Sequence, residues 1–362
     1  MNIENKRAYF ECMRILACGL VIFNHVGGYG LYMISSGWKQ IFYMCLTMIT
    51  RINVPIFFMI SGALLLSKKD SVQNVWKKRI PKIVEVLLLF DGIILIVYKL
   101  LAIRNHNEYE ISIEKYIMGF LKNELDGTGA YWYMYAYVGF LVMLPFLQRV
   151  AKELSKAEVL MLIILHVIAN SFLPMINIGL STIGIESAGI DSNFQVPFAF
   201  EKAFFYPLIG YYLECNVDIN KLKRKYIIGL VIAGSIGIGL SNMCTYYEGI
   251  TTGTFTQNYV QLFDYLTAII TFLLIKYIFV VWKPTWNDGM QGKIICTVGS
   301  LTLGIYMLDP ILKVILGSGY NNWASPRFPT LLVSIGWILI SMTLGGCITY
   351  IMKKIPGIRR IM

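Results

Sequence analysis

Long apolar runs dominate the chain and determine its predicted architecture. A helix needs about 20 apolar residues to cross a hydrocarbon core of about 30 Å. Ten apolar runs cover residues 10–31, 44–66, 80–103, 131–150, 157–177, 199–214, 226–245, 258–282, 294–316 and 329–352. The run at 199–214 is short, which suits a tilted or partly re-entrant helix. The pattern predicts an all-α protein, a polytopic membrane helix bundle with about ten transmembrane helices.

The Lys and Arg residues predict the orientation of this bundle. With the N-terminus in the cytoplasm, 23 of the 32 Lys and Arg lie at cytoplasmic helix ends and five lie in outer loops. The remaining four lie within the runs or at their edges. Cytoplasmic loops of membrane proteins carry an excess of Lys and Arg. We therefore expect both the N-terminus and the C-terminus to be cytoplasmic.

The composition agrees with a membrane protein and excludes other classes. Of the 362 residues, 56% are hydrophobic and 15% are charged, and the mean hydropathy is +0.61. A soluble globular chain is about half apolar and about a quarter charged, so a disordered, fibrous or ordinary cytosolic protein is excluded. The net charge of +11 would suggest nucleic acid as the partner of a soluble protein. Here the bias toward positive cytoplasmic loops explains it, and we expect no nucleic-acid partner.

No second module is visible in the sequence. It contains no internal repeat and no low-complexity tract, and the tail after Tyr350 is short and basic. The seven cysteines form no CxxC pair, so neither a disulfide framework nor a metal site is expected. We predict a single integral-membrane domain over residues 1–362, surrounded by membrane lipid. We expect no soluble accessory domain and no bound cofactor.

The first apolar run carries ionisable residues on one helical face. Arg14 and His25 are 11 residues apart, which is about three helical turns and about 16 Å along the axis. Glu11 and Arg14 are spaced i, i+3 and can form an ion pair. Ionisable residues within a span are costly and usually face a protein interior or an aqueous cavity. Two interpretations stay open: a functional cation and imidazole, or an interfacial anchor and a packing histidine.

The second run contains a proline and a pair of small residues. It includes Asn53 and Pro55 near its middle and Ser61-Gly62 further on. Pro55 removes a main-chain donor and favours a kink. The small pair would let another backbone or a substrate approach closely, but small residues also mediate ordinary helix contacts in membranes. Substrate contact and helix packing are both open here.

A basic segment precedes the third run. It reads Lys77-Lys78-Arg79-Ile80-Pro81-Lys82. Such clusters mostly determine topology or contact lipid headgroups. The same residues would also suit the phosphates of a nucleotide-bearing donor.

Later runs carry aromatic, acidic and histidine residues. Trp132 and Tyr133 near the start of the fourth run are typical of the aromatic belt at the outer interface, although a carbohydrate would also stack there. The ninth run contains Tyr306 and, in mid-span, Asp309. Burial of Asp309 is costly unless the carboxylate is paired or lines water. His166 stands alone in the fifth run, and we interpret it as a hydrogen-bonded core residue.

Together these motifs resemble the acyltransferase 3 family of multispanning membrane O-acyltransferases. Residues 9–25 resemble the first span of that family, and residues 54–62 resemble its second-span signature. Residues 78–82 resemble its basic loop, and residues 132–133 and 304–306 fit looser motifs. The resemblance covers nearly the whole chain. The first two motifs are specific in combination, whereas the others are not.

The resemblance implies transfer of an acyl group, commonly acetyl from acetyl-CoA, to a sugar hydroxyl of a cell-envelope or surface polysaccharide. The expected location is the plasma membrane of a bacterium. The expected partners are acyl-CoA as co-substrate and a glycan or lipid-linked sugar as acceptor. His25 would be the general base that removes the hydroxyl proton. The residues expected at the donor and substrate sites are Glu11, Arg14, Asn53, Ser61, Arg79, Trp132, Tyr133, Tyr306 and Asp309.

The chain departs from the family pattern in its ninth run. Many relatives have histidine before the proline of this span, whereas this chain has Asp309 before Pro310. We therefore expect the function of that histidine to be carried out differently here.

A carrier or exporter of a glycan, lipid or small metabolite would also use a helix bundle with a polar interior. The sequence shows no inverted repeat and no pair of interrupted helices in corresponding halves. That absence, with the stripe of Arg14 and His25, favours the enzyme. An accessory membrane subunit without chemistry stays a third hypothesis. Consumption of acyl-CoA by the purified protein separates the enzyme from both alternatives.

Overall fold

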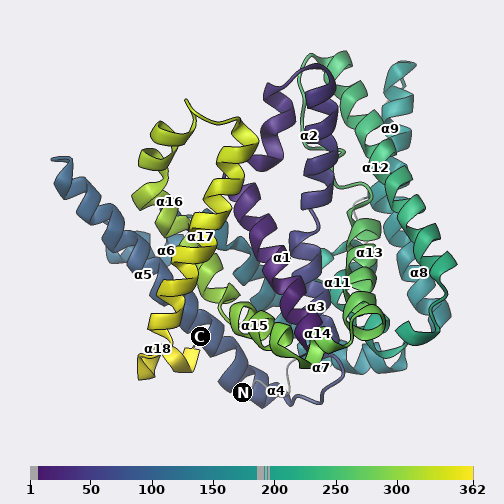
Figure 1. Ribbon diagram of the computed structural model, residues 1–362, viewed down its shortest axis with the longest axis horizontal. Coiled ribbons are helices and arrows are strands. Elements are labelled where there is room, and N and C mark those ends of the chain that lie inside the picture. Colours follow the sequence, from purple (N-terminus) through teal and green to yellow (C-terminus); the bar gives the residue numbers. More distant parts are fainter. Residues whose placement is uncertain (1–6, 186–190, 192–193, 195, 362) are drawn as a thin grey trace. The chain divides into compact units, whose positions relative to one another are not determined.

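The computed structural model describes residues 7–185, 191, 194 and 196–361, and all regular elements within these ranges are helices (Figure 1). The predicted all-α class is confirmed for this part of the chain. The chain divides into two compact units, each assembled from separate stretches of sequence. Unit 1 comprises the described residues within 1–20, 28–69 and 146–296, and unit 2 those within 21–27, 70–145 and 297–362. The prediction of a single domain stays a prediction.

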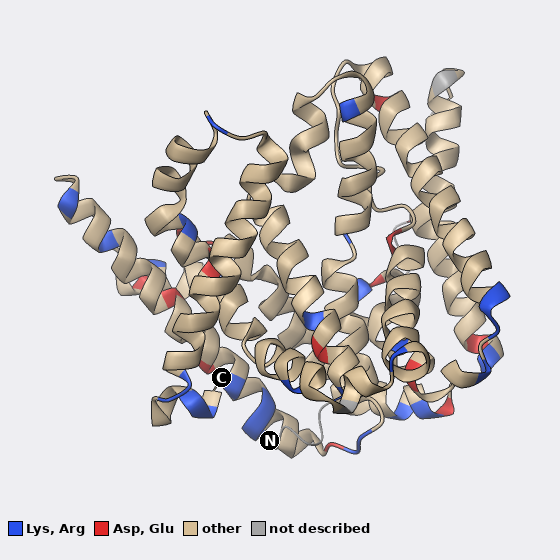
Figure 2. Cartoon of the chain, viewed as in Figure 1, with Lys and Arg blue, Asp and Glu red and all other residues tan. Residues whose placement is uncertain are grey.

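Among the described residues, eight helical segments are long and apolar enough to cross a membrane. They are Gly37–Leu65, Val72–Arg104, Thr128–Glu153, Lys156–Ser181, Arg224–Thr252, Asp264–Trp282, Thr302–Ala324 and Thr330–Met352. Each matches one of the expected apolar runs. Lys and Arg lie mainly at helix ends and in connections, with long uncharged stretches between them (Figure 2).

Two of the ten expected spans differ from the prediction. The first run folds as helix α1 (Ala8–His25) and the short 3-10 helix η2 (Gly28–Ile34), which are bent by 43° and form a ninth span only if taken together. The run at 199–214 gives the 14-residue helix α11 (Lys202–Cys215), which is shorter than the about 20 residues that a bilayer requires. The short run therefore yields a short helix, as its length suggested.

Unit 1 contains the first part of α1, the last turns of α7 (Trp132–Glu153) and most of α15 (Met290–Gly299). Its other elements are η2, α2 (Gly37–Thr50), α3 (Asn53–Leu65), α8 (Lys156–Val167), η5 (Ile168–Phe172), α9 (Leu173–Thr182), α10 (Pro197–Phe200), α11, η6 (Ile219–Lys221), α12 (Arg224–Thr252), α13 (Asp264–Tyr277), η7 (Ile278–Trp282) and α14 (Thr285–Asp288). Helix α12 packs against α13 and α9 (Figure 1).

Glycines bring α3 and α11 into backbone contact within unit 1. A Cβ atom added to Gly62 would lie 1.9 Å from the carbonyl oxygen of Pro207. A Cβ atom added to Gly210 would lie 2.1 Å from the carbonyl oxygen of Met59. Only glycine allows this approach. Of the two interpretations of the Ser61-Gly62 pair, the helix contact is therefore confirmed for Gly62.

The helix of the second apolar run is broken before Pro55. Helix α2 ends at Thr50 and α3 begins at Asn53. The proline ring would clash with the carbonyl group of Arg51, four residues earlier, in a continuous helix. In the first turn of a new helix a missing N–H costs nothing. Pro55 thus lies in the first turn of α3, and Arg51 lies between the two helices. The kink that Pro55 favours stays a prediction.

Unit 2 contains the last residues of α1, most of α7 and the end of α15. Its other elements are α4 (Val72–Asn74), η3 (Val75–Arg79), α5 (Ile80–Arg104), α6 (Ile113–Lys122), η4 (Thr128–Tyr131), α16 (Thr302–Ala324), α17 (Thr330–Met352) and α18 (Pro356–Ile361). Helix α16 packs against α17 and against α5 (Figure 1). Most of the first half of α16 is buried, including Asp309 and Pro310.

Candidate functional site

The imidazole of His25 and the carboxylate of Asp309 meet within unit 2. Helix α1 ends at His25, and α16 contributes Asp309. The Nδ1 atom of His25 lies 2.8 Å from Oδ2 of Asp309. The Asp309 side chain is fully buried, whereas 19% of the His25 side chain is exposed. The pair therefore combines a carboxylate shielded from solvent with an accessible imidazole.

Helix α17 holds the other oxygen of the Asp309 carboxylate. Ser341 Oγ donates a hydrogen bond to Oδ1 at 2.8 Å, and Trp337 Nε1 donates to the same oxygen at 3.2 Å. Trp337 and Ser341 are four residues apart, so they project from one face of α17. A buried carboxylate is costly unless its oxygens are paired. Both oxygens of Asp309 are paired here, which explains how the acid is tolerated in mid-span.

A second contact from α16 fixes the main chain at His25. The Nζ group of Lys313 donates a hydrogen bond to the His25 carbonyl oxygen. Lys313 follows Asp309 by one helical turn, so both side chains leave the same face of α16. Carbonyl groups at a helix C-terminus lack intrahelical donors, and a lysine satisfies one of them favourably. His25 is thus held by its ring and by its backbone.

Tyrosines surround this pair. The Tyr306 ring lies 6.2 Å from the His25 ring, between centroids, and meets the rings of Tyr131 and Tyr133 edge-on at 6.3 Å each. Tyr306 donates a hydrogen bond to the Ala130 carbonyl oxygen. These contacts join the start of α7 to α16 and limit the movement of Tyr306.

Pro310 contributes to this arrangement through the main chain of α16. It has no N–H and cannot bond the carbonyl group of Tyr306, four residues earlier. The neighbouring carbonyl oxygen of Met307 accepts a hydrogen bond from Tyr131 at 2.7 Å. A side chain of the α7 region therefore bonds the α16 backbone where the proline perturbs it.

The carboxylate determines what the imidazole can do. We assign the Nδ1 proton from its contact with Asp309, which leaves Nε2 as the acceptor. Within the described residues Nε2 has no hydrogen-bond partner. An imidazole oriented by a buried carboxylate is the arrangement by which proteins remove a proton from a hydroxyl group. The site can therefore act as a general base.

Arg14 forms the ion pair that its spacing predicted. Its Nη1 atom lies 2.5 Å from Oε1 of Glu11. The Arg14 side chain is 30% exposed and the Glu11 side chain 4% exposed. Arg14 shares α1 with His25 but belongs to unit 1. The guanidinium group keeps further N–H donors that an anion could accept.

Arg79 is paired at the start of α5 in unit 2. Its Nη2 atom donates to both carboxylate oxygens of Asp70, at 3.0 Å and 2.9 Å, and Nε donates at 3.3 Å. The basic segment before the third run therefore has an acidic partner at this position. Its role in donor binding stays a prediction.

The other predicted residues lie as follows. In α3, Asn53 Oδ1 accepts a hydrogen bond from the main-chain N–H of Val54 at 2.8 Å. Ser61 Oγ donates to the Phe57 carbonyl oxygen at 2.8 Å. Both groups are thus engaged within their own helix. Trp132 is half exposed at the start of α7. Their binding roles stay predictions.

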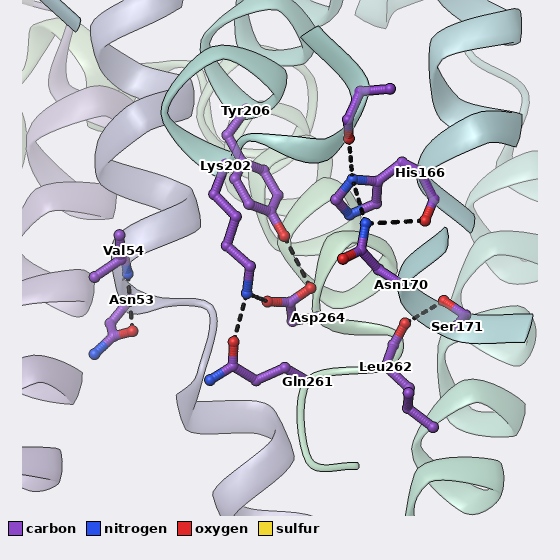
Figure 3. A network of polar contacts seen from close by, with 11 residues as sticks. Asn53, Val54, His166, Asn170, Ser171, Lys202, Tyr206, Gln261, Leu262 and Asp264 are labelled. Carbon is purple, nitrogen blue, oxygen red and sulfur yellow. Dashed lines mark hydrogen bonds and ion pairs between the residues drawn. The ribbon is translucent and has the colours of Figure 1, made fainter. Parts of the chain in front are cut away.

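His166 is a core residue, as its sequence context suggested (Figure 3). The side chain is buried, and Nδ1 lies 2.6 Å from the carbonyl oxygen of Ala199. The ring stacks on Phe205 with centroids 3.9 Å apart. Both contacts explain its burial without a chemical role.

Sequence reasoning missed three residues of the His25 site: Lys313, Trp337 and Ser341. A faint signal was present for two of them, because Trp337 and Ser341 place hydrogen-bond donors one turn apart in the last apolar run. Such donors need an acceptor inside the protein. Nothing along the chain identifies Asp309 as that acceptor.

A family described as an acyltransferase domain matches residues 7–352. The match covers nearly the whole chain and includes His25, Asp309 and every residue in contact with them. Neither a curated protein nor a solved structure matches the chain. The family and the apolar helices together establish a multi-pass membrane protein with the acyltransferase domain.

Proposed function

The chain belongs to the acyltransferase 3 family, and from this premise we propose that this membrane acyltransferase moves an acetyl group from acetyl-CoA to a sugar hydroxyl of a cell-envelope or surface glycan. The observation that carries the proposal is the contact of 2.8 Å between the accessible His25 imidazole and the buried Asp309 carboxylate. It supplies an oriented base in a chain whose family transfers acyl groups.

His25 acts as the general base. Its Nε2 atom accepts the proton of the sugar hydroxyl while the oxygen attacks the thioester carbonyl carbon. The C–O bond forms and the C–S bond breaks as the tetrahedral intermediate collapses. The CoA sulfur leaves with the electron pair of the C–S bond and takes the proton back from the imidazolium. General-base catalysis of this kind contributes about 10²–10⁴-fold to the rate.

Asp309 is a positioning residue in this mechanism. Its carboxylate holds the Nδ1 proton of His25, which keeps Nε2 free for the hydroxyl group. It also stabilises the positive charge that the ring acquires. Trp337 and Ser341 fix the carboxylate in turn. Asp309, the acidic residue before Pro310, thus orients the His25 ring directly. This role does not require the histidine that many relatives have before the proline.

Arg14 and Arg79 bind phosphates of the donor. Arg14 precedes His25 by 11 residues on α1, and the long arm of CoA carries the thioester from the phosphates toward the imidazole. An arginine can pair with a phosphate and a carboxylate together because it has five N–H donors. Glu11 holds the Arg14 guanidinium for this contact. The orientation with a cytoplasmic N-terminus brings Arg14 to the side where acetyl-CoA is made.

Tyrosines and tryptophan receive the acceptor. Tyr133 and Tyr306 meet edge-on beside His25, and the half-exposed Trp132 precedes Tyr133. Aromatic faces bind the apolar faces of sugars, and phenol groups bond their hydroxyls. The acceptor that these residues fit is a glycan or a lipid-linked sugar.

The deciding experiment measures transfer of radiolabelled acetyl from acetyl-CoA into membrane glycan at matched protein abundance. We expect His25→Ala to abolish transfer, and we expect the control His166→Ala to retain most of it. Release of CoA by the purified wild type separates an enzyme from a carrier. Transfer at the wild-type rate by His25→Ala would refute the mechanism, and absence of CoA release by the wild type would refute the enzyme.

A further inference from the structure

A second cluster of polar side chains lies within unit 1, on residues that the proposed chemistry does not use (Figure 3). The Nζ atom of Lys202 lies 3.0 Å from Oδ2 of Asp264 and also donates to Oε1 of Gln261. Tyr206 donates a hydrogen bond to the other oxygen of Asp264 at 2.8 Å. The Asp264 side chain is 2% exposed and that of Lys202 is 39% exposed. The partly exposed ammonium group of Lys202 is thus paired with the buried carboxylate of Asp264.

Arg51 adds a second cation to the same unit. Its guanidinium carbon lies 5.1 Å from the centroid of the Tyr29 ring, and Nη2 donates to Oε1 of Gln257. Its Nε atom is buried and has no hydrogen-bond partner among the described residues. Gln257, the acceptor for Arg51, and Gln261, the acceptor for Lys202, are four residues apart in the segment that precedes α13. One short segment therefore contacts both cations.

Ion pairing differs between the two cations. Lys202 is paired with Asp264. The Glu248 carboxylate of the same unit accepts hydrogen bonds from Thr256 at 2.6 Å and Asn258 at 2.7 Å. Within the described part of the chain, no carboxylate forms an ion pair with Arg51. The ion pairs of this cluster thus leave the charge of Arg51 without a partner.

The location makes this unpaired charge costly. Arg51 lies midway along the 29-residue candidate span Gly37–Leu65, between α2 and α3. Lys202 begins α11 and Asp264 begins α13. Irregular backbone at membrane depth is tolerated only inside protein or beside a water-filled cavity. A cation there normally has a partner or marks the path of a substrate.

Donor groups remain for such a partner. An ammonium group has three N–H donors and a guanidinium has five. Lys202 uses two N–H donors, for Gln261 and Asp264. Arg51 uses one, for Gln257. The unfilled requirement is for an anion with several acceptor oxygens.

We propose that Arg51 and Lys202 bind a phosphate group carried by a lipid-soluble molecule. Phosphate offers acceptor oxygens for the orphaned Nε of Arg51 and for the free N–H of Lys202, and its negative charge would pair with Arg51. A lipid-soluble carrier fits a site midway along a candidate span. Asp264, Gln257 and Gln261 orient the two cations. The inference does not depend on the chemistry proposed for His25.

The test uses the purified full-length chain in detergent, without acetyl-CoA, and measures the thermal unfolding temperature against ligand concentration. We expect farnesyl phosphate to raise this temperature saturably, and we expect farnesol, which has the same chain and no phosphate, to leave it unchanged. Phosphatidylglycerol is the third probe: a shift at the same concentrations identifies the phosphate of a phospholipid headgroup, and its absence identifies an isoprenoid-linked phosphate. An equal shift with farnesol would overturn the proposal.

Variants assign the effect to the two cations. Each charge-assisted contact accounts for roughly a 10- to 150-fold change in affinity, so Lys202→Gln and Arg51→Gln should weaken farnesyl phosphate binding by at least about 10-fold. Lys39→Gln, at an exposed lysine of the same unit, is the matched control and should bind like the wild type. If Arg51→Gln fails to fold, Lys202→Gln decides, because its side chain is partly exposed. Unchanged affinity in Lys202→Gln would contradict the proposal.

Discussion

The Nδ1 atom of His25 and the Oδ2 atom of Asp309 lie 2.8 Å apart, although 284 residues separate them in the sequence. The contact explains two features that were separate in the sequence: a histidine at the end of the first helix and an acid in the middle of a late one. Each residue provides what the other requires, because the carboxylate needs a donor and the imidazole needs an oriented proton.

The first prediction concerns Asp309→Asn. An asparagine amide can donate to Nδ1, which favours the tautomer with the proton on Nε2 and removes the base. We expect kcat for acetyl transfer to fall by about 10²–10⁴-fold, with little change in the KM for acetyl-CoA. Steady-state kinetics at matched protein amounts provide the measurement.

A double variant provides the control for this prediction. Residues that act as one unit are not additive, so His25→Ala with Asp309→Asn should be no slower than His25→Ala alone. Ser341→Ala removes one of two donors to Asp309 Oδ1 and should cause a smaller loss than Asp309→Asn. A multiplicative loss in the double variant would mean that Asp309 acts independently of His25.

The second prediction concerns the donor site. Arg14→Ala and Arg79→Ala should each weaken acetyl-CoA binding, because charge-assisted contacts contribute about 1.5–3 kcal/mol, or roughly 10- to 150-fold. Binding of acetyl-CoA to the purified variants provides the measurement. Lys77→Ala, at an exposed lysine close to Arg79, is the control and should bind normally. Normal binding by both arginine variants would leave the basic segment with a topological role only.

The third prediction concerns packing of α3 against α11. Gly62→Ala places a methyl group 1.9 Å from a backbone oxygen of Pro207, and backbone atoms cannot yield without separating the helices. We expect a clear loss of folded protein in the membrane and a lower thermal unfolding temperature. Gly229→Ala in α12 is the matched control, since no atom lies within 4 Å of the added Cβ. Equal stability of the two variants would show that the helices separate easily.

The fourth prediction concerns orientation. Reporter fusions after Lys69, Lys225 and Lys354 should report the cytoplasm, because these positions follow or lie in the basic loops. A fusion near Glu114, in α6 between the third and fourth apolar runs, should report the opposite side. Cytoplasmic reporter activity at Glu114 would mean that the segment Val72–Arg104 does not cross the membrane.

The sequence alone supported the helical class and most spans, because long apolar runs and helical periodicity are local properties. It also predicted the ion pair of Glu11 with Arg14 and the core role of His166. The number of spans was less secure. The run that includes α1 is bent by 43° after His25, and the run at 199–214 yields only a short helix, because hydropathy counts apolar residues without locating helix ends.

The partners of Asp309 depended on the tertiary structure. Spacing along one helix determines which residues share its face, as for Arg14 and His25 on α1 and for Asp309 and Lys313 on α16. It cannot determine which face of another helix lies opposite, because that depends on the packing of α1, α16 and α17 within unit 2. The sequence by itself thus determined that a histidine and an acid lie inside apolar helices at an energetic cost. Only the tertiary structure decided that they offset each other's cost, because their pairing depends on contacts between distant segments.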